Sequence, residues 1–215
     1  MSLLVATPMY GGVCDIAYFQ GCLDLKEFLV GEGIAHDWLV VDKESLVQRA
    51  RNTIAAAFLQ TDYRKLLFID ADIGFTVDDV GKLWNLDTDV AVGVYPMKRM
   101  DKCWYAAWVN GKLVTDLDFD GPVEVDYAGT GFMMIDRGVF EKMKSERIRH
   151  EEGSGECWAF FDPRVENGVY LSEDYAFCED WRKLGGKVVM DPTVKLSHIG
   201  KCEYGPELAA KLRPR

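Results

Sequence analysis

The sequence predicts a mixed α/β fold: a mostly parallel central sheet flanked by helices, with a small antiparallel portion in the second half of the chain. Three observations support this prediction. Apolar runs of strand length alternate with helix-length segments through the first hundred residues, which is typical of βαβ units. Residues 66–69 are apolar without a break, as in a strand covered on both faces. Residues 104–127 alternate in short stretches around Asn-Gly and Gly-Pro turns, which predicts hairpins.

The individual elements follow from the same patterns in chain order. The first strand ends at a proline and a Gly-Gly pair, and the second helix carries apolar residues at helical spacing on one face. Residues 147–170 are rich in charge and glycine, and a loop of that length is usually a lid, a binding loop or disordered. We expect strands at 3–7, 37–42, 66–69, 89–96, 129–135 and 187–191, and helices at 15–30, 44–60, 76–86, 136–143 and 173–184.

Composition limits the class of protein. With 215 residues, 48% of them hydrophobic, the chain can bury the core of a single domain. Its net charge of −10 argues against nucleic acid or an anionic membrane as a general partner. The six cysteines form no C-x-x-C pair, so we expect reduced thiols. There is no leader-like start and no run approaching the roughly 20 apolar residues of a membrane span, so we expect a cytoplasmic protein.

Two carboxylates follow the apolar run 66–69 directly. In extended backbone Asp70 and Asp72 would point to the same side, and their oxygens could converge on one Mg²⁺ or Mn²⁺ ion that keeps water and phosphate oxygens as its other ligands. The carboxyl edge of an open α/β sheet is where ligands bind. The alternative is a turn whose aspartates cap the helix that begins near Thr76.

Two further charged residues lie on predicted inward faces. Arg51 falls on the apolar stripe of its helix, whereas Arg49 points the opposite way. A buried guanidinium needs a partner, which could be a structural carboxylate or the base or phosphate of a nucleotide. With Ser172 as the N-cap, Asp174 shares a face with Phe177. It could deprotonate or orient an acceptor hydroxyl, or it could simply favour the helix dipole.

The late segment around His198 completes the candidate chemistry. A lone histidine is usually a satisfied core or surface residue, but beside a D-x-D motif it is a plausible nitrogen ligand for the same ion. Lys201 could neutralise a departing diphosphate or could be a solvated charge.

Taken in order, these segments resemble the nucleotide-sugar-dependent glycosyltransferases of the GT-A fold, in particular compact viral and bacterial members. The resemblance covers roughly residues 3–202. It implies one GT-A domain over residues 1–215, with a nucleotide-binding part at about 1–100 and an acceptor-side part at about 101–215. The segments are ARN at 50–52, FIDAD at 68–72, GTGF at 129–132, SED at 172–174 and HIGK at 198–201.

The resemblance also implies roles for single residues. Asp70 and Asp72, with Ala71 between them, match the metal and ribose motif, His198 the histidine that completes the metal site, and Lys201 the lysine on the leaving phosphate. The residues placed around the base, usually uracil, are Thr7, Pro8, Tyr10, Asp42 and Arg51. Gly129, Thr130 and Gly131 match the glycine loop near the donor sugar, and Asp174, next to Glu173, matches the catalytic base of inverting members, although retaining relatives can keep an acid there.

The implied reaction is Mn²⁺- or Mg²⁺-dependent transfer of a sugar from a nucleotide-diphosphate sugar, usually a UDP-sugar, to a glycan or other hydroxyl acceptor. Three alternatives stay open. Haloacid-dehalogenase-like phosphatases also carry D-x-D after an apolar strand, but usually on the first strand and with Thr or Ser where this chain has Ile73-Gly74. A sugar nucleotidyltransferase would need a basic glycine-rich loop, and residues 7–15 contain no Lys or Arg. The third alternative is a glycan- or nucleotide-binding module without turnover.

Overall fold

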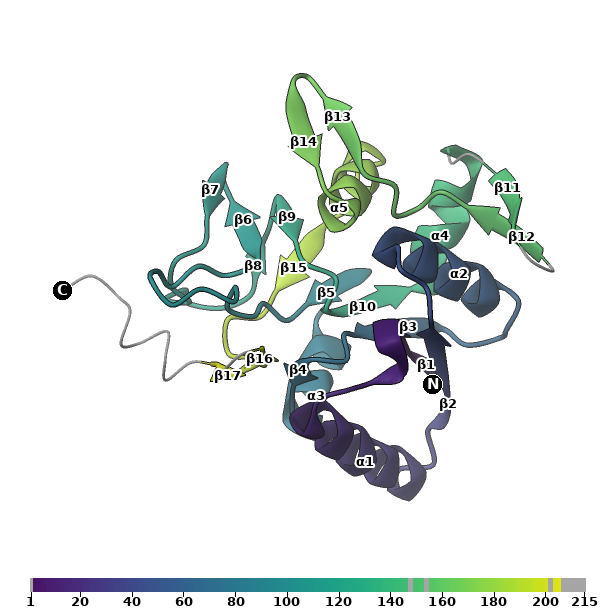
Figure 1. Ribbon diagram of the computed structural model, residues 1–215, viewed down its shortest axis with the longest axis horizontal. Coiled ribbons are helices and arrows are strands. Elements are labelled where there is room, and N and C mark those ends of the chain that lie inside the picture. Colours follow the sequence, from purple (N-terminus) through teal and green to yellow (C-terminus); the bar gives the residue numbers. More distant parts are fainter. Residues whose placement is uncertain (1, 147–148, 153–154, 201–202, 206–215) are drawn as a thin grey trace.

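The computed structural model describes residues 2–146, 149–152, 155–200 and 203–205, and its centre is a seven-stranded sheet (Figure 1). The strand order is β2-β1-β3-β10-β5-β15-β8, in which β10 and β8 run antiparallel to the other five. This confirms the predicted fold class. The strands are β1 Ser2–Met9, β2 Ala35–Asp42, β3 Lys65–Ile69, β5 Val90–Val92, β8 Val123–Glu124, β10 Phe132–Asp136 and β15 Val188–Met190.

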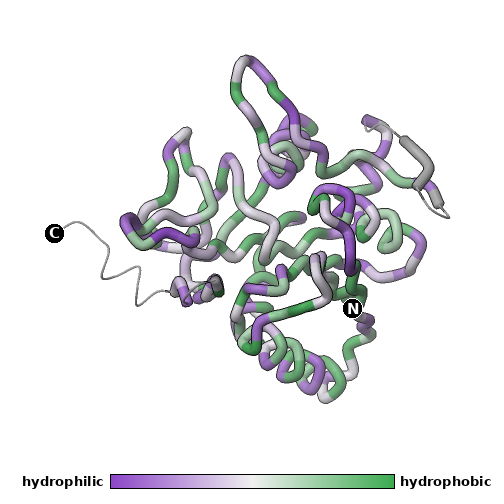
Figure 2. Tube along the Cα trace, viewed as in Figure 1, coloured by the Kyte–Doolittle hydropathy of each residue, from purple (hydrophilic) through white to green (hydrophobic). Residues whose placement is uncertain are grey.

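Helices cover both faces of this sheet. Leu66 and Phe68 of β3 belong to one core cluster, whereas Leu67 and Ile69 belong to the other. The unbroken apolar run is therefore a strand buried on both sides, as predicted. Hydrophobic residues follow the central strands in Figure 2. On one side lie α1 Ile16–Gly31 and α3 Val77–Asn85, and on the other α2 Val47–Leu59, α4 Arg137–Met143 and α5 Glu173–Lys183.

Two small antiparallel sheets flank the carboxyl edge of the large one. The hairpin between β6 and β7 turns at Asn110 and Gly111, whose φ values of 51° and 72° suit a tight two-residue turn. The second sheet joins the segment after β3 to the end of the chain, because β16 pairs with β4. These sheets contain β6 Ala107–Val109, β7 Lys112–Leu113 and β9 Tyr127–Ala128, and β4 Ile73–Gly74, β16 Ser197–Ile199 and β17 Glu203–Tyr204.

The expectation of a loop without secondary structure over 147–170 is wrong for its described residues, whereas a role as a lid or a binding loop stays a prediction. Phe160 and Phe161 are fully buried, and the Phe161 ring stacks on Phe177 with centroids 4.6 Å apart. These two rings belong to the core cluster beneath the sheet and anchor the middle of the segment. The segment instead forms two hairpins, β11 Arg149–Glu152 with β12 Gly155–Trp158 and β13 Arg164–Glu166 with β14 Val169–Leu171. Two short 3₁₀ helices, η1 Tyr10–Gly12 and η2 Lys144–Glu146, complete the described elements.

Polar contacts anchor this segment to the helices beneath it. The Asn52 side chain on α2 accepts a hydrogen bond from the Phe161 amide at 2.9 Å and donates one to Asp162 at 2.9 Å. Arg164 forms a two-pronged ion pair with Asp180 on α5, at 2.9 and 2.7 Å. Asn52 thus has a structural role that fixes the segment against α2.

Two predictions from composition can be compared with the described residues. None of the helices in the described ranges combines the length and the apolar character needed to cross a membrane. Five cysteines in those ranges are free thiols, of which Cys14 is exposed.

Candidate active site

The turn after β3 separates the two aspartates of the D-x-D motif. The strand ends at Ile69, and the Ile73 amide donates a hydrogen bond to the Asp70 carbonyl at 3.0 Å, which closes a turn over residues 70–73. The expectation that residues 70–72 are extended, with both aspartates on the same side, is therefore wrong. The alternative that these aspartates cap the next helix is wrong too, because Thr76 and Asp79 cap α3 reciprocally.

Asp72 faces two cationic or potentially cationic groups. Its Oδ2 lies 2.5 Å from Lys98 Nζ, and its Oδ1 lies 3.6 Å from His198 Nε2. Pairing of β16 with β4 and a 2.8 Å hydrogen bond from the Ile199 amide to the Asp72 carbonyl hold the histidine strand here. Burial alone would raise the pKa of Asp72, but the contacts from His198 and Lys98 lower it to about 2. The carboxylate is ionised at neutral pH.

The His198 ring is oriented by its surroundings. Its Nδ1 lies 3.0 Å from the Pro96 carbonyl, which can only accept, so Nδ1 carries the proton and donates. The Tyr95 ring packs edge-on against the imidazole at a centroid distance of 5.0 Å. The other ring nitrogen, Nε2, faces Asp72. Donation of the Nδ1 proton to a backbone carbonyl is the usual second-shell arrangement of a metal-binding histidine.

Asp70 turns away from this pair toward Arg51. The guanidinium Nη2 lies 3.0 and 3.1 Å from the two Asp70 carboxylate oxygens, and Nε lies 3.9 Å from Glu173 Oε1. Burial would lower the pKa of Arg51, but the Asp70 carboxylate raises it. Arg51 Nε and Nη1 are buried and make no hydrogen bond within the described part of the chain. Arg51 therefore links the end of β3 to the start of α5.

The predicted base lies in this same neighbourhood, at the first turn of α5. Asp174 accepts hydrogen bonds from the Ser172 hydroxyl and from the Tyr175 amide, the latter at 2.8 Å. Burial raises the pKa of Asp174 against these hydrogen bonds, and burial together with the nearby Asp174 charge raises the pKa of Glu173. Two partly buried acids whose pKa values are raised, at the edge of a sheet, are typical of a functional site.

The glycine loop packs against Tyr95. The Gly131 amide donates to the Tyr95 hydroxyl at 3.1 Å, and a Cβ on Gly129 would lie within 2.4 Å of the same oxygen. A Cβ on Gly131 would also lie 2.9 Å from Asp70 Oδ2. Only glycine therefore fits at these two positions. Thr130 between them is buried, and its Oγ1 has no hydrogen-bond partner among the described residues.

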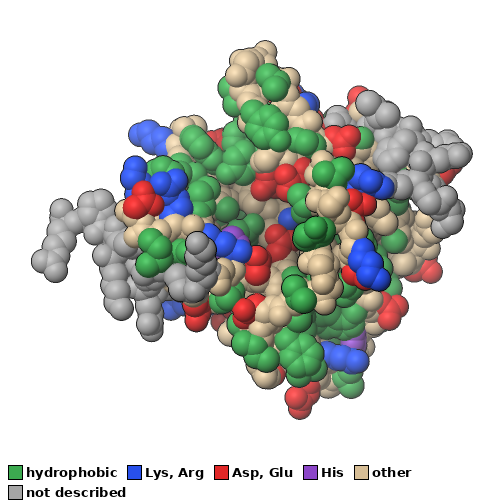
Figure 3. Space-filling view, viewed as in Figure 1, with side chains coloured by type: hydrophobic (Ala, Val, Ile, Leu, Met, Phe, Trp, Pro, Cys, Tyr) green, Lys and Arg blue, Asp and Glu red, His purple; other side chains and the backbone are tan. Residues whose placement is uncertain are grey.

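A pocket of about 470 Å³ opens beside the two aspartates. Pro8, Tyr10, Asp70, Ala71 and Asp72, all predicted site residues, line it together with Val13, Cys14, Asp15, Val47, Ile199 and Gly200. In the space-filling view of Figure 3, acidic side chains gather in a hollow at the middle of this face, with basic and histidine side chains at its edge.

The lining of this pocket leaves out nine predicted residues that the structure describes: Thr7, Asp42, Arg51, Gly129, Thr130, Gly131, Glu173, Asp174 and His198. Thr7 is buried and its hydroxyl lies 2.6 Å from the Tyr18 hydroxyl. Asp42 ends β2, with its side chain 52% exposed and 3.5 Å from Lys43. Lys201 lies outside the described residues.

Sequence reasoning missed Lys98 and Tyr95. Both follow β5, whose carboxyl end lies at the same sheet edge as that of β3. The signal was the segment Tyr-Pro-Met-Lys directly after an apolar strand, because polar residues at strand ends on this edge are the ones that meet a ligand.

The donors fit a divalent cation that keeps much of its own hydration. No group of three or more His, Cys, Asp or Glu side chains in the described ranges is placed to hold a metal ion. Asp72 and His198 converge from two elements, whereas the Asp70 carboxylate is held by Arg51. One carboxylate and one imidazole, completed by water and phosphate oxygens, match the way Mg²⁺ or Mn²⁺ is bound at nucleotide sites.

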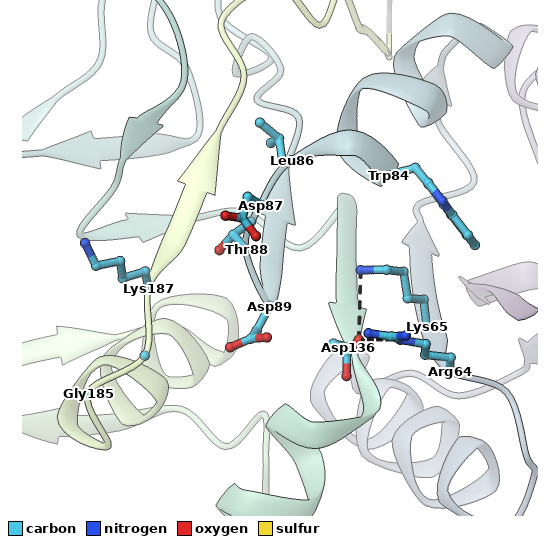
Figure 4. A pocket seen from close by; sticks show the side chains of 11 residues that line it. Arg64, Lys65, Trp84, Leu86, Asp87, Thr88, Asp89, Asp136, Gly185 and Lys187 are labelled. Carbon is cyan, nitrogen blue, oxygen red and sulfur yellow. Dashed lines mark hydrogen bonds and ion pairs between the residues drawn. The ribbon is translucent and has the colours of Figure 1, made fainter. Parts of the chain in front are cut away.

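A larger pocket, about 540 Å³, lies at the opposite edge of the sheet (Figure 4). Arg64 and Lys65 on its wall are already paired with Asp136, at 3.2 and 4.0 Å. None of the predicted site residues in the described ranges lines it. We therefore place the candidate active site at the smaller pocket, which Asp70 and Asp72 line. Asp72 faces His198, and Asp70 lies between Arg51 and the glycine loop.

Comparisons with known proteins bear on the fold. Neither protein-family models nor curated proteins give a match. Among solved structures, A197 from STIV is 21% identical, with 93% of this chain and 86% of that chain covered and a TM-score of 0.55. GalNAc-T7 with UDP, GalNAc and Mn²⁺ is 12% identical, with 93% and 44% covered and a TM-score of 0.49. A mutant Drosophila β1,4-galactosyltransferase 7 with manganese, UDP-Gal and xylobiose is 16% identical, with 93% and 71% covered and a TM-score of 0.47.

The sequence identities and TM-scores decide which of these likenesses bears on this chain. The TM-scores below 0.5 are too low to carry an argument about this chain, and the low identity to A197 limits that likeness to the fold. The chain therefore shares its mixed α/β fold with A197 from STIV.

Proposed function

We propose that this chain is a metal-dependent glycosyltransferase that moves a sugar from a nucleotide-diphosphate sugar, most simply a UDP-sugar, to a hydroxyl of a glycan or other acceptor. The observation that carries the proposal is the 3.6 Å separation of Asp72 Oδ1 and His198 Nε2 beside a pocket at the carboxyl edge of the sheet.

The pocket suits the nucleotide half of such a donor. Tyr10 is 73% exposed at its mouth and offers an aromatic face for a base, and Pro8 lies beside it on the pocket wall. In this proposal Asp42 and Thr7 support that wall from β2 and β1, and the diphosphate extends from the base toward Asp72. When bound, the Mn²⁺ or Mg²⁺ ion supplies Lewis-acid stabilisation of the negative charge that develops on the leaving group.

The protein residues do the remaining work. Asp72 and His198 would hold the ion, and Gly129, Thr130 and Gly131 let the donor sugar approach the backbone closely. Asp174 is proposed as the base that accepts the acceptor proton, since burial raises its pKa toward a useful range. Glu173 and Arg51 fix the start of α5 relative to Asp70, so that acceptor and donor meet in one geometry.

The partners and the location follow as parts of the same proposal. The donor is a UDP-sugar, the acceptor a glycan or a small hydroxyl compound, and the net charge of −10 disfavours nucleic acid. We assign the protein to the cytoplasm.

Thermal-shift measurements with UDP, Mn²⁺, and both together test the proposal. Ligand that binds only the folded chain at a hundred times its Kd stabilises it by about 2.7 kcal/mol, so the largest shift is expected with UDP and Mn²⁺ together. Mn²⁺-dependent release of UDP from a UDP-sugar should accompany it. Asp72→Ala should lose both effects, whereas Asp120→Ala, which removes the same charge at an exposed turn, should keep them.

Two outcomes would contradict the proposal. One is an equal response to UDP with and without metal, and the other is full UDP release by Asp72→Ala. A phosphoaspartate trapped at Asp70 would favour the phosphatase alternative instead. UDP binding without any turnover would favour the binding module.

A further inference from the structure

Lys98 occupies a position that the proposed function needs for a metal ion. Its Nζ lies 2.5 Å from Asp72 Oδ2, on the carboxylate whose other oxygen faces His198. We propose that Lys98 is an exchangeable counter-cation: it neutralises Asp72 before a divalent cation binds, and it then moves onto the diphosphate of the donor. This inference rests on the proposed function and deepens it.

The exchange follows from electrostatics. An ammonium and a divalent cation on one carboxylate would lie within a few ångströms of each other, where like charges repel strongly. The hard dication binds carboxylate oxygens more strongly than an ammonium does, so the lysine gives way.

The Lys98 side chain is free to make this move, whereas its backbone is held. The Met97 amide donates to the Trp104 carbonyl at 2.7 Å, and the Arg99 amide donates to the Met97 carbonyl at 2.7 Å. The Lys98 side chain is 35% exposed, and its Cδ lies 3.1 Å from the position of a Cβ on Gly200, a residue that lines the pocket. A four-carbon stem can swing the ammonium from Asp72 into that pocket.

A diphosphate at this site requires an additional local cation. The chain carries a net charge of −10, and acids line the pocket. Arg51 is committed to Asp70 and is buried. A departing nucleoside diphosphate carries more negative charge than one dication neutralises, and the Lys98 ammonium supplies the difference from the pocket rim.

The competition between Lys98 and a divalent cation for Asp72 is tested by titrating the nucleotide-free protein with Mn²⁺. The electron paramagnetic resonance signal of free Mn²⁺ follows the binding. Lys98→Gln removes the competing charge, and Arg99→Gln removes an equal charge from the next residue, which pairs with Asp101 instead. Loss of a partly exposed ion pair corresponds to a change of roughly two- to fivefold. We expect Lys98→Gln to bind Mn²⁺ more tightly than Arg99→Gln by that factor.

The movement of Lys98 onto the diphosphate is tested by the affinity for UDP at saturating Mn²⁺, measured by calorimetry. Lys98→Gln should bind UDP about tenfold more weakly than Arg99→Gln, as expected for a lost charge-assisted contact. The exchange is overturned if both variants bind Mn²⁺ alike, or if neither they nor the wild type bind it. It is also overturned if Lys98→Gln keeps full UDP affinity.

These outcomes separate the inference from the proposed function. UDP and Mn²⁺ binding that is equal in both variants would leave the glycosyltransferase proposal standing without the exchange. A change in Mn²⁺ affinity together with a UDP-sugar that is never turned over would leave the exchange standing and overturn the reaction.

Discussion

Replacing Arg51 with methionine should be among the most destabilising single changes in the site. The Arg51 side chain is 4% exposed, and it faces Asp70 at 3.0 Å and Glu173 at 3.9 Å. Removing one member of a buried ion pair costs about 3–5 kcal/mol. The Asp70 and Glu173 side chains are 27% and 19% exposed, and water can partly solvate them. We therefore expect a loss of about 2–4 kcal/mol, or roughly 5–15 °C in Tm for a chain of this length.

Urea unfolding followed by circular dichroism measures this loss through the midpoint and the slope. Arg49→Met is the matched control, because Arg49 lies on the same helix with its side chain 50% exposed and pairs with Glu44 at 3.4 Å. It should cost no more than about 1 kcal/mol. Equal losses in the two variants would refute the view that Arg51 is a buried link.

The stability loss of Arg51→Met should depend on pH. Burial and the Asp174 charge raise the pKa of Glu173 in the folded protein, and Arg51 opposes that rise. Without Arg51 the folded pKa rises further above the unfolded one, so folded Glu173 binds a proton more readily than unfolded Glu173. The deficit of Arg51→Met should then be largest near pH 7 and shrink as the pH falls toward 4. A deficit that grows on acidification would contradict this account.

Three further changes give distinct outcomes. Asp174→Asn should lower kcat by about 10²–10⁴ and leave UDP binding unchanged. Because burial raises the pKa of Asp174, the activity of the wild type should begin to fall on acidification at a higher pH than the pKa of an ordinary aspartate would give. Asn52→Ala should cost about 2–3 kcal/mol and accelerate hydrogen exchange at the Phe161 amide. Gly131→Ala should destabilise the fold, since its Cβ would lie 2.6 Å from a buried tyrosine oxygen, whereas Gly81→Ala on an open helix face should not.

The periodicity of the sequence was enough to predict the sheet and its two-sided cover. The run 66–69 alternates between the two core clusters, and the Asn110-Gly111 turn forms where expected. The hairpins in 149–171 were not predictable, because their strands are only three or four residues long and mix charged with apolar residues. The burial of Phe161 depends on Asn52, which is more than a hundred residues away in sequence.

Local patterns also limited the prediction of the site. Helical spacing indicated correctly that Arg51 points inward, but it could not decide between a carboxylate and a nucleotide as its partner, because that partner comes from another strand. The Asp70 and Asp72 side chains were expected to point to the same side, and the turn closed by the Ile73 amide makes them diverge. A single hydrogen bond of the backbone decides this, and residue types alone do not reveal it.

Because the two side chains diverge, Asp70 and Asp72 have different roles, and their substitution should affect stability and Mn²⁺ binding differently. Asp70 pairs with the buried Arg51, so Asp70→Asn should cost a few kcal/mol by leaving that guanidinium without its anion. Asp72 has partly exposed partners, so Asp72→Asn should change stability by less than about 1 kcal/mol and yet abolish Mn²⁺ binding. The folded pKa of Asp72 is lowered to about 2, so its contribution is present above the ordinary pKa and lost as the pH falls toward 2. Urea unfolding and Mn²⁺ titration of both variants check this division. If Asp70→Asn unfolds like the wild type, or Asp72→Asn still binds Mn²⁺, the two acids share one role and the turn does not separate them.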